Sequence, residues 1–537
     1  MERFIKLFAT LVPFQMSVAE HVEFGAALWF DELWHFYEFV EVNNTTWERN
    51  FQFVFSGLAK YCPGYVDWTP RHTVIFSKLL RTLDLSVRGG KVTVGGGADG
   101  CEQNGAEWIV WMLGGANDSA EKHLERLMRC VESFLHPLHE GMHTTTLQSF
   151  LTALVSEMVH RVRIERVCRK KKIVVPERLL LSDRNIESFV SIILPSVLYA
   201  VFSTFETKTP SHILRNLAFL APNLVLPKVL DLVYPSLWTV TEPNRLQRSL
   251  DCLIEICVPL VRDNGRRIYE TFNICERDWI SEIDEDTASS ATNDIESYSH
   301  SYSRTDSEKE ARTPPTERKP LRRHAITLLG ALVEALDIND VNKLSLAFRA
   351  LESFFTLIPI VDCSAAVNMI KYNNLSEEEK LLCEATGRLP TIVEKFVERV
   401  FKLISQLDID VPKDSTTTLD SICDISRTTA FGKDEMLISR RIQGAFHSLL
   451  TNSSSAIVKA NPSKYFHLFL THISANLDQL ITDEVKKEAV LEPTVVWFIC
   501  LAMMLFSVPG KLLLKYHKKC VDLHKMLISL KCANAYR

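Results

Sequence analysis

Three prolines fall within one short stretch, LAFLAPNLVLPKVLDLVYPSL, which otherwise has the apolar pattern of a helix. Pro222 is expected to end a first helix, because the residue before a proline is pushed out of the α region. Pro227 is expected to begin a second helix, since the first turn tolerates a residue without an N–H. The prolines would then separate short helices, the pattern of a HEAT-like helical repeat. Apolar residues at helical spacing support both helices: Ile213, Leu217, Leu220, Leu226, Leu230, Val233 and Leu237.

A third helix is expected directly after this stretch. Thr241 can cap its amino end, and Pro243 falls in its first turn. Pro235 is expected to kink the second helix. Three consecutive helices within about fifty residues leave room for short connections only.

The same pattern of amphipathic segments extends over most of the chain, and convincing strand patterns are scarce. We therefore predict an all-α fold, an α-α superhelix or solenoid of HEAT-like or ARM-like repeats, over residues 1–280 and 319–537. The helices expected before the middle of the chain are Ala26–Val42, Thr46–Lys60, His72–Leu85, Ser119–Leu135, Leu147–Arg166 and Asn185–Phe205. Those expected after it are Ile326–Leu336, Val341–Thr356, Ser376–Ala385, Pro390–Leu407, Met436–Leu450, Ser463–Leu480, Pro493–Phe506 and Lys515–Leu530.

One segment, residues 281–318, breaks this pattern. Its sequence, SEIDEDTASSATNDIESYSHSYSRTDSEKEARTPPTER, is acidic, rich in serine and threonine, and nearly free of aliphatic residues. Such a segment buries too little apolar surface to offset the entropy of ordering it. We predict a long disordered insert between two sets of repeats.

Charge and cysteine content exclude several classes of protein. The formal net charge is −5, so no global positive field favours nucleic acid, and we expect no direct nucleic-acid contact. The 13 cysteines include no C-x-x-C pair, which suits reduced thiols rather than a secreted disulfide framework. The apolar run TVVWFICLAMMLFSVPG is shorter than the ~20 residues that span a bilayer. We expect a buried core helix there and no membrane contact.

The most specific chemical pattern is HEGMH, in which His139, Glu140 and His143 match the H-E-x-x-H motif of zinc peptidases. In that motif two histidines one helical turn apart bind the metal, and the glutamate polarises its water. Gly141 and the preceding Pro137 favour an inter-helix loop instead. A zinc peptidase is therefore the weaker interpretation, and we expect no enzyme activity, metal or other cofactor. The glycine-rich VRGGKVTVGGGADG lacks the G-K-[ST] of a phosphate loop and is expected to be a plain loop.

A dense basic run, HRVRIERVCRKKK, follows at the end of an expected helix. Two interpretations remain open. In the first, the charges complement the negative end of the helix dipole. Alternatively they form a contact patch for acidic partners, phosphates or nucleic acid, made of Arg161, Arg163, Arg166, Arg169, Lys170, Lys171 and Lys172.

Several phrases of this sequence resemble, in order, the proteasome activator complex subunit 4 family. They begin with LWFDEL, GYVDWTP and IFSKLLRTLDLSV, and continue with VWMLGG, SFLHP and NLAFLAPNLVLPKVLDLVYPSLWTVTEP. After the acidic insert follow FTLIPIVDCSAAV, NNLSEEEKLLCEAT and KLLLKYHKKCVDLHKMLISLKC. The resemblance covers nearly the whole chain, but only part of the N-terminal half of the family's much longer proteins.

The resemblance implies a large HEAT-repeat solenoid that caps the proteasome core particle. Such proteins use no ATP, loosen the gated entrance and promote ubiquitin-independent breakdown of peptides and proteins, including acetylated histones. They act in the nucleus and cytoplasm, with links to DNA repair. The resemblance therefore implies the proteasome core particle as partner, with acetylated histones as possible cargo.

This chain departs from the family pattern at its end, NAYR. The family opens the gate with a C-terminal tail carrying a penultimate tyrosine, but the residues before Tyr536 match an internal stretch of the family. The gate-opening role is therefore not assigned to Tyr536 and Arg537. We expect a fragment or partial gene product, with a shortened paralogue as the second interpretation. A generic HEAT scaffold, such as a transport receptor that binds extended partners, is the alternative function.

Overall fold

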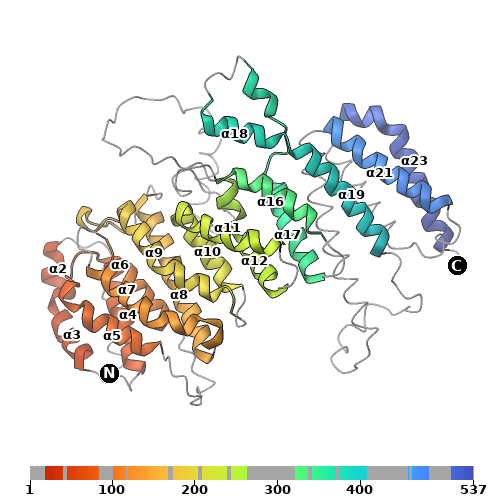
Figure 1. Cartoon of the computed structure of the whole chain (residues 1–537). Helices are drawn as coiled ribbons and strands as arrows, with labels where there is room; N and C mark the ends of the chain where they lie inside the picture. The colour runs from red at the N-terminus through yellow and green to blue at the C-terminus, as the bar shows by residue number, and fades with distance from the viewer. Residues whose placement is uncertain are drawn as a thin grey trace, which may run out of the picture. The chain divides into compact units, whose positions relative to one another are not determined.

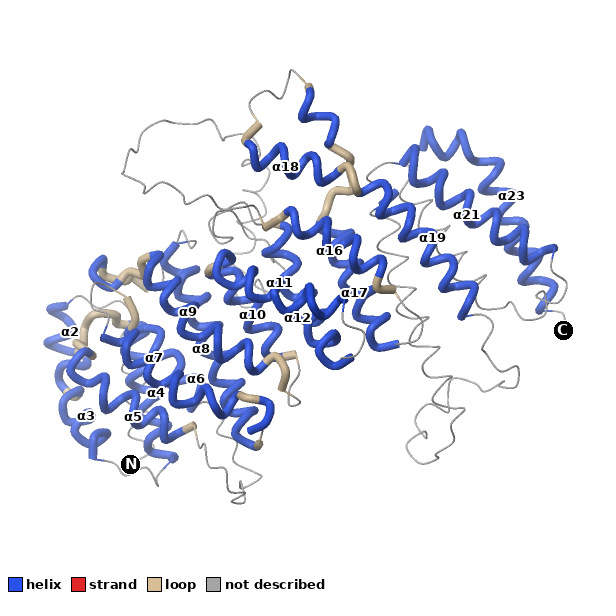
Figure 2. The backbone as a smooth tube through the Cα atoms, viewed as in Figure 1, coloured by secondary structure: helices blue, strands red, loops and turns tan. Residues whose placement is uncertain are grey.

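The computed structural model places most of the chain in helices. Its described residues are 18–39, 45–83, 101–114, 119–139, 141–166, 173–203, 208–238, 243–262, 321–336, 341–369, 375–407, 457–458, 462–482 and 510–535. Within these ranges there are α-helices and short 3-10 helices and no strand (Figure 2). The fold is therefore all-α, as the sequence predicts. The chain divides into two compact units. Of the described residues, those up to Val197 and the segment Asn216–Leu224 belong to the first unit, and the others belong to the second.

The first unit is built from helices that follow one another along the chain. They are α2 (Val18–Phe24), α3 (Phe30–Phe39), α4 (Thr45–Tyr61), α5 (His72–Thr82), α6 (Cys101–Met112), α7 (Ser119–Val131), α8 (Met142–Arg166) and most of α9 (Asp183–Ala200). The 3-10 helices between them are η1 (Ala26–Leu28), η2 (Thr69–Arg71), η3 (Glu132–Leu135), η4 (Pro137–His139) and η5 (Glu177–Leu179).

Alternate helices of this unit stack on one another in two layers (Figure 1). Helices α4, α6 and α8 pack side by side in that order, and α5 packs against α7. Helix α6 therefore has a neighbour on both sides within its layer and further contacts to α5 and α7. This stacking is the arrangement of helical repeats, in which each repeat buries its apolar face against the next.

Aromatic rings form the core at the amino end of this unit. Trp108 of α6 lies against Trp34, Tyr37, Phe55 and Trp68, with ring centroids 5.2–6.5 Å apart. All five side chains are buried. Edge-to-face and tilted contacts of this kind add to the hydrophobic gain from burying large rings.

The second unit contains the remaining helices. They are the start of α10 (Thr209–Leu220), most of α11 (Pro222–Trp238), α12 (Pro243–Val261), α16 (Arg323–Glu334), α17 (Val341–Leu357), α18 (Glu377–Thr386), α19 (Leu389–Leu407), α21 (Pro462–Thr482) and α23 (Gly510–Ala535), with η7 (Ser364–Asn368). Helix α12 packs on α17. Helix α19 packs on α16 and on α21, and α21 also packs on α23. Side-by-side packing of successive helices thus recurs in this unit.

The proline-rich stretch is helical as predicted, but one boundary is wrong. Helix α10 ends at Leu220 and α11 begins at Pro222, whereas the sequence placed the start at Pro227. Pro222 already supplies a residue without an N–H in the first turn, so the helix starts there and continues through Pro227 and Pro235. The third helix is confirmed, with Pro243 as its first residue.

Most other predicted helices are present with shifted ends. The expected helix from Ala26 is divided into η1 and α3, and α8 begins five residues before the expected Leu147, at Met142. The sequence analysis missed helix α6. Its residues from Trp108 to Met112 are all buried and all apolar, so this part of the helix lacks the alternation of apolar and polar residues that identifies an amphipathic helix.

Several predictions concern parts of the chain outside the described residues. They are the glycine-rich loop, the acidic insert 281–318, the helices Met436–Leu450 and Pro493–Phe506, and the apolar run TVVWFICLAMMLFSVPG apart from its last residue, Gly510. Among the helices that the structure describes, none is long and apolar enough to cross a membrane.

Candidate functional site at the two ends of α8

Helix α8 carries both of the chemical patterns singled out in the sequence. The HEGMH motif lies at its amino end, and the basic run begins in its last two turns. The helix packs against α6 in the layer formed by α4, α6 and α8. Its two ends therefore decide whether either pattern can form a site.

At the amino end, the two histidines are not on one helix face. His139 closes η4, and His143 is the second residue of α8. The Nδ1 atom of His139 lies 2.9 Å from the carbonyl oxygen of Ser133, and Nε2 of His143 lies 3.3 Å from that of Phe134. Each ring is thus engaged by a backbone carbonyl.

This arrangement lacks the helical turn that a zinc peptidase uses to aim two histidines at one metal. Glu140 lies outside the described residues. Among the residues that the structure does describe, no three His, Cys, Asp or Glu side chains are grouped to hold a metal ion. The inter-helix loop predicted around HEGMH ends before Met142, where α8 begins.

At the carboxyl end, Arg161 is buried, with 1% of its surface exposed. Its guanidinium donates hydrogen bonds to the carbonyl oxygens of Val110 and Leu113, 2.6 and 2.7 Å away, at the end of α6. It also donates to the carbonyl of Leu179 at 2.6 Å and to Oε1 of Glu165 at 2.7 Å. Arg161 therefore ties α6, α8 and the segment before α9 together, and it is not part of a surface patch.

The physical reason is the shape of the guanidinium group. Its five N–H donors point in fixed directions, and the last carbonyls of α6 have no partners within their own helix. The group also lies over the ring of Trp111, 5.0 Å from the centroid. Burial lowers the pKa of Arg161, while the carboxylate of Glu165 opposes this change. An arginine keeps its charge in such a site because its ordinary pKa is so high.

A second group of charged side chains joins α4, α6 and α8, the three helices of this layer. Lys60 of α4 forms ion pairs with Glu107 of α6 and with Glu157 of α8, the latter at 3.1 Å. The indole Nε1 of Trp111 donates to the same Glu157 oxygen at 2.7 Å. The carboxylates raise the pKa of Lys60 against the lowering effect of burial, so the lysine is charged. Three neighbouring helices are thereby joined by polar contacts.

The other predicted patch residues divide into two groups. Arg163 is half-buried, and Arg166 donates to Oδ1 of Asp183 at 2.6 Å and to the carbonyl of Leu181 at 2.7 Å. Arg166 thus fixes the start of α9. Arg169, Lys170, Lys171 and Lys172 lie outside the described residues, and a contact patch there stays a prediction.

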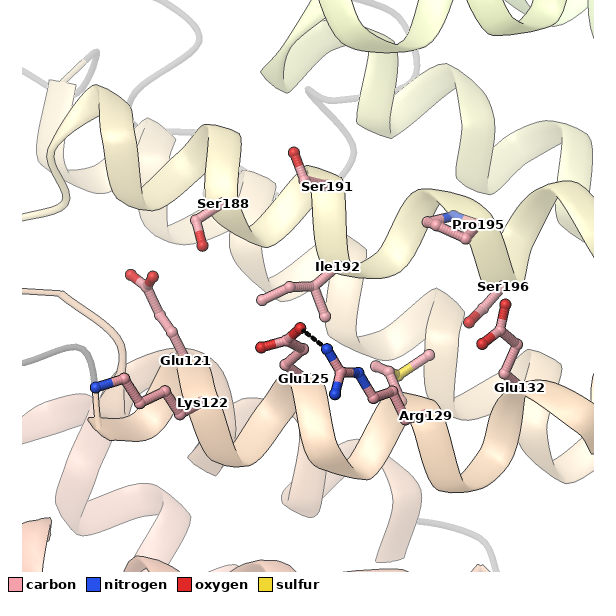
Figure 3. Close-up of a pocket in the computed structure, with 11 residues that line it drawn as sticks. Glu121, Lys122, Glu125, Arg129, Glu132, Ser188, Ser191, Ile192, Pro195 and Ser196 are labelled. Carbon is pink, nitrogen blue, oxygen red and sulfur yellow. Dashed lines mark hydrogen bonds and ion pairs between the residues drawn. The ribbon is translucent and has the colours of Figure 1, made fainter.

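The sequence analysis did not indicate a groove that the structure describes in the first unit. It lies between α7 and α9 and has a volume of about 460 Å³ (Figure 3). Carboxylates of Glu121, Glu125 and Glu132 lie along its α7 side, and serines lie along α9. Glu125 pairs with Arg129 at 2.6 Å, and Glu121 accepts a hydrogen bond from Asn185 at 2.6 Å. Glu121 and Glu125, four residues apart in α7, were the sequence signal that could have indicated this groove.

Helices stacked in this way define a class of protein, the helical-repeat proteins. A family model described as "Proteasome activator complex subunit 4, mid HEAT repeats region" matches residues 124–296 and 313–536. The chain therefore belongs to the proteasome activator complex subunit 4 family. The resemblance noted in the sequence is confirmed, as is the HEAT-repeat fold.

Individual relatives agree with this assignment. The chain is 28% identical over 563 residues to proteasome activator complex subunit 4 of Bos taurus and, equally, to that of Homo sapiens. Both matches cover all of this chain. The proteasome activator subunit 4 of Arabidopsis thaliana is 23% identical over 271 residues, which cover 46% of this chain and 14% of the relative. The chain spans 28% of the length of the animal relatives.

Proposed function

We propose that this chain contributes a helical-repeat segment to a proteasome-activating cap. It would bind the proteasome core particle without ATP and favour entry of substrates, acting through contact and not through chemistry of its own. The observation that supports this proposal is the family match, which extends over both structural units. The relatives are named as proteasome activators, and the proposed partner and the proposed activity are both taken from those names.

The finer parts of the proposal come from the resemblance. We propose that the substrates are peptides and proteins degraded without ubiquitin, with acetylated histones among them, and that the chain acts in the nucleus and cytoplasm in support of DNA repair. Stacked repeats suit this role, because they present a long surface for protein partners and need no cofactor.

Binding and activation can be measured together. The full chain, carrying an affinity tag, is incubated with purified core particle, and both the captured core and the hydrolysis of a fluorogenic peptide are recorded. The proposal expects core particle in the captured fraction and faster hydrolysis at saturating chain. Failure of both would refute it. Capture without faster hydrolysis would restrict the role to docking.

The basic residues after α8 offer a contact to test in the same assay. Reversing Arg169, Lys170, Lys171 and Lys172 to glutamate is expected to weaken capture if these side chains meet acidic groups of the core. Reversing only Lys170 and Lys171 gives a variant with the same change of charge as the control, which reverses Lys122 and Arg126, two exposed basic residues of α7. Equal capture by both variants would favour the alternative, in which the basic run only complements the helix dipole.

A further inference from the structure

Helix α23 carries a row of lysines on one side. Between residues 511 and 522 there are four lysines and one acidic residue, Asp522. At 3.6 residues per turn, Lys511, Lys515 and Lys518 fall within about 60° of the helix circumference, and Lys519 lies a further ~40° around. Lys511, Lys515 and Lys518 are exposed, and Lys519 is half-buried. The four lysines together are called the lysine row.

No ion pair neutralises the lysine row within the part of the chain that the structure describes. Lys515 lies over the ring of Tyr516, 5.3 Å from the centroid, which leaves its charge in place. Like charges at i, i+4 spacing destabilise a helix slightly. Asp522, one turn beyond Lys518 on the same side of the helix, is the one acidic residue of α23 between residues 511 and 522. Four lysines therefore face a single carboxylate, and the excess positive charge is a cost to the helix that a partner would offset.

One edge of the lysine row borders a groove between α21 and α23, which pack on each other (Figure 1). The groove has a volume of about 340 Å³ and is lined by Ser474 of α21 and by residues of α23. Tyr516 forms its wall, held by ring contacts to Phe466 and His467 at 5.8 and 5.9 Å. Three lysines of the row, Lys515, Lys518 and Lys519, reach this groove.

The other edge of the row is apolar. Leu514 is 74% exposed and Val521 is 46% exposed, and their spacing of seven residues places them on one stripe of the helix. This stripe lies next to Lys518 on the helix surface. The exposed side of α23 therefore combines positive charge with a narrow aliphatic border.

We propose that the lysine row and its aliphatic border form a docking surface for an acidic segment of a partner protein that also carries aliphatic side chains. Carboxylates of that segment would meet the lysine row, and its aliphatic residues would cover Leu514 and Val521. This inference concerns binding by the chain itself and does not depend on proteasome activation.

The composition of the surface favours a peptide over other polyanions. It contains no arginine, the residue that matches phosphates with paired hydrogen bonds. The aliphatic border offers no ring on which a base would stack, and the half-buried ring of Tyr516 at the other edge is engaged by Phe466, His467 and Lys515. Two aliphatic side chains are few for a helix that lies in a lipid interface. Carboxylates beside aliphatic groups match both parts of the surface.

The test is fluorescence anisotropy with the full chain. The probe is a fluorescein-labelled peptide with glutamates at the spacing of the lysine row and leucines at the spacing of Leu514 and Val521. Reversing Lys515, Lys518 and Lys519 to glutamate is expected to weaken binding at least about tenfold, since each attraction becomes a repulsion. Leu514→Ser with Val521→Ser is expected to weaken it about threefold. Lys122→Glu, a charge reversal on α7, is the control and is expected to change nothing.

Further probes separate the alternatives. An oligothymidylate strand and vesicles of phosphatidylserine and phosphatidylcholine are titrated in parallel. Tighter binding of either one than of the peptide would overturn the proposal, as would unchanged peptide affinity in the charge-reversal variant. Circular dichroism checks that the variants fold. If the reversal unfolds the chain, the neutral set Lys515→Gln, Lys518→Gln and Lys519→Gln replaces it, with a smaller loss of affinity expected.

Discussion

Removing the guanidinium of Arg161 is expected to destabilise the first unit strongly. The side chain is buried and satisfies three carbonyl oxygens and one oxygen of Glu165. In Arg161→Ala the carboxylate of Glu165 keeps its hydrogen bond from the amide of Leu181 but loses its positive partner. The carbonyl groups at the end of α6 lose their donors as well.

The magnitude follows from the burial of the pair. Breaking a buried ion pair by removing one partner costs about 3–5 kcal/mol, because the other charge is left uncompensated. Unsatisfied carbonyls cost about 1–3 kcal/mol each, although relaxation and water entry keep these losses from adding fully. We expect Arg161→Ala to lower the free energy of unfolding by about 4 kcal/mol. Arg161→Lys should lose about half as much, since one ammonium cannot reach all four acceptors.

Urea unfolding followed by tryptophan fluorescence measures this effect in the right part of the chain. Six of the nine tryptophans lie between residues 29 and 111, so the signal reports mainly on the first unit. The double variant Arg161→Met with Glu165→Met tests the cause, because removing both charges should recover part of the loss. A loss below about 1 kcal/mol in Arg161→Ala would refute the reasoning, since that is the range of an exposed ion pair.

Three further changes test other contacts of the same unit. Gly114 has a φ of +108°, and a Cβ there would lie 2.4 Å from the carbonyl oxygen of Leu179, so Gly114→Ala should lower the free energy of unfolding by about 3 kcal/mol in urea titrations. Lys60→Met leaves two nearly buried carboxylates without their partner and should lose about 3 kcal/mol, with partial recovery when Glu157→Gln is added. Burial lowers the pKa of His72 from 6.5 to about 4, so the unfolded chain binds more protons between these values, and stability falls as the pH drops through this window. His72→Gln should flatten that dependence in urea titrations at several pH values, and an unchanged slope would contradict it.

The helices of this chain were largely predictable, because a helix that buries one face has apolar residues every three or four positions. Prolines marked the boundaries near Leu220 and Pro243 for a local steric reason. Helix α6 escaped because it is covered on nearly all sides, so that its sequence from Trp108 onwards contains no polar stripe. Where burial is uniform, periodicity carries no information.

The role of Arg161 could not be predicted in the same way. In the sequence it is one of seven basic residues in a short run, and nothing local separates it from Arg163 or Arg166. Its acceptors at Val110 and Leu113 are 51 and 48 residues away, so only the packing of α6 on α8 brings them together. The HEGMH motif shows the reverse case. The local pattern is present, but His139 belongs to a 3-10 helix and His143 belongs to an α-helix.

The stacking of α4, α6 and α8 also has a consequence for how this unit comes apart. Among the described residues, the main contacts of each helix are with the next in its layer and with a few across it, so the loss of a helix at an edge removes mainly one interface. Amide protons of α6, which is enclosed on both sides, should exchange with solvent last, and those of α2 and α3 first. We therefore expect this unit to unfold from its end helices first. Its central helices should stay folded under conditions that unfold a small domain with a single core.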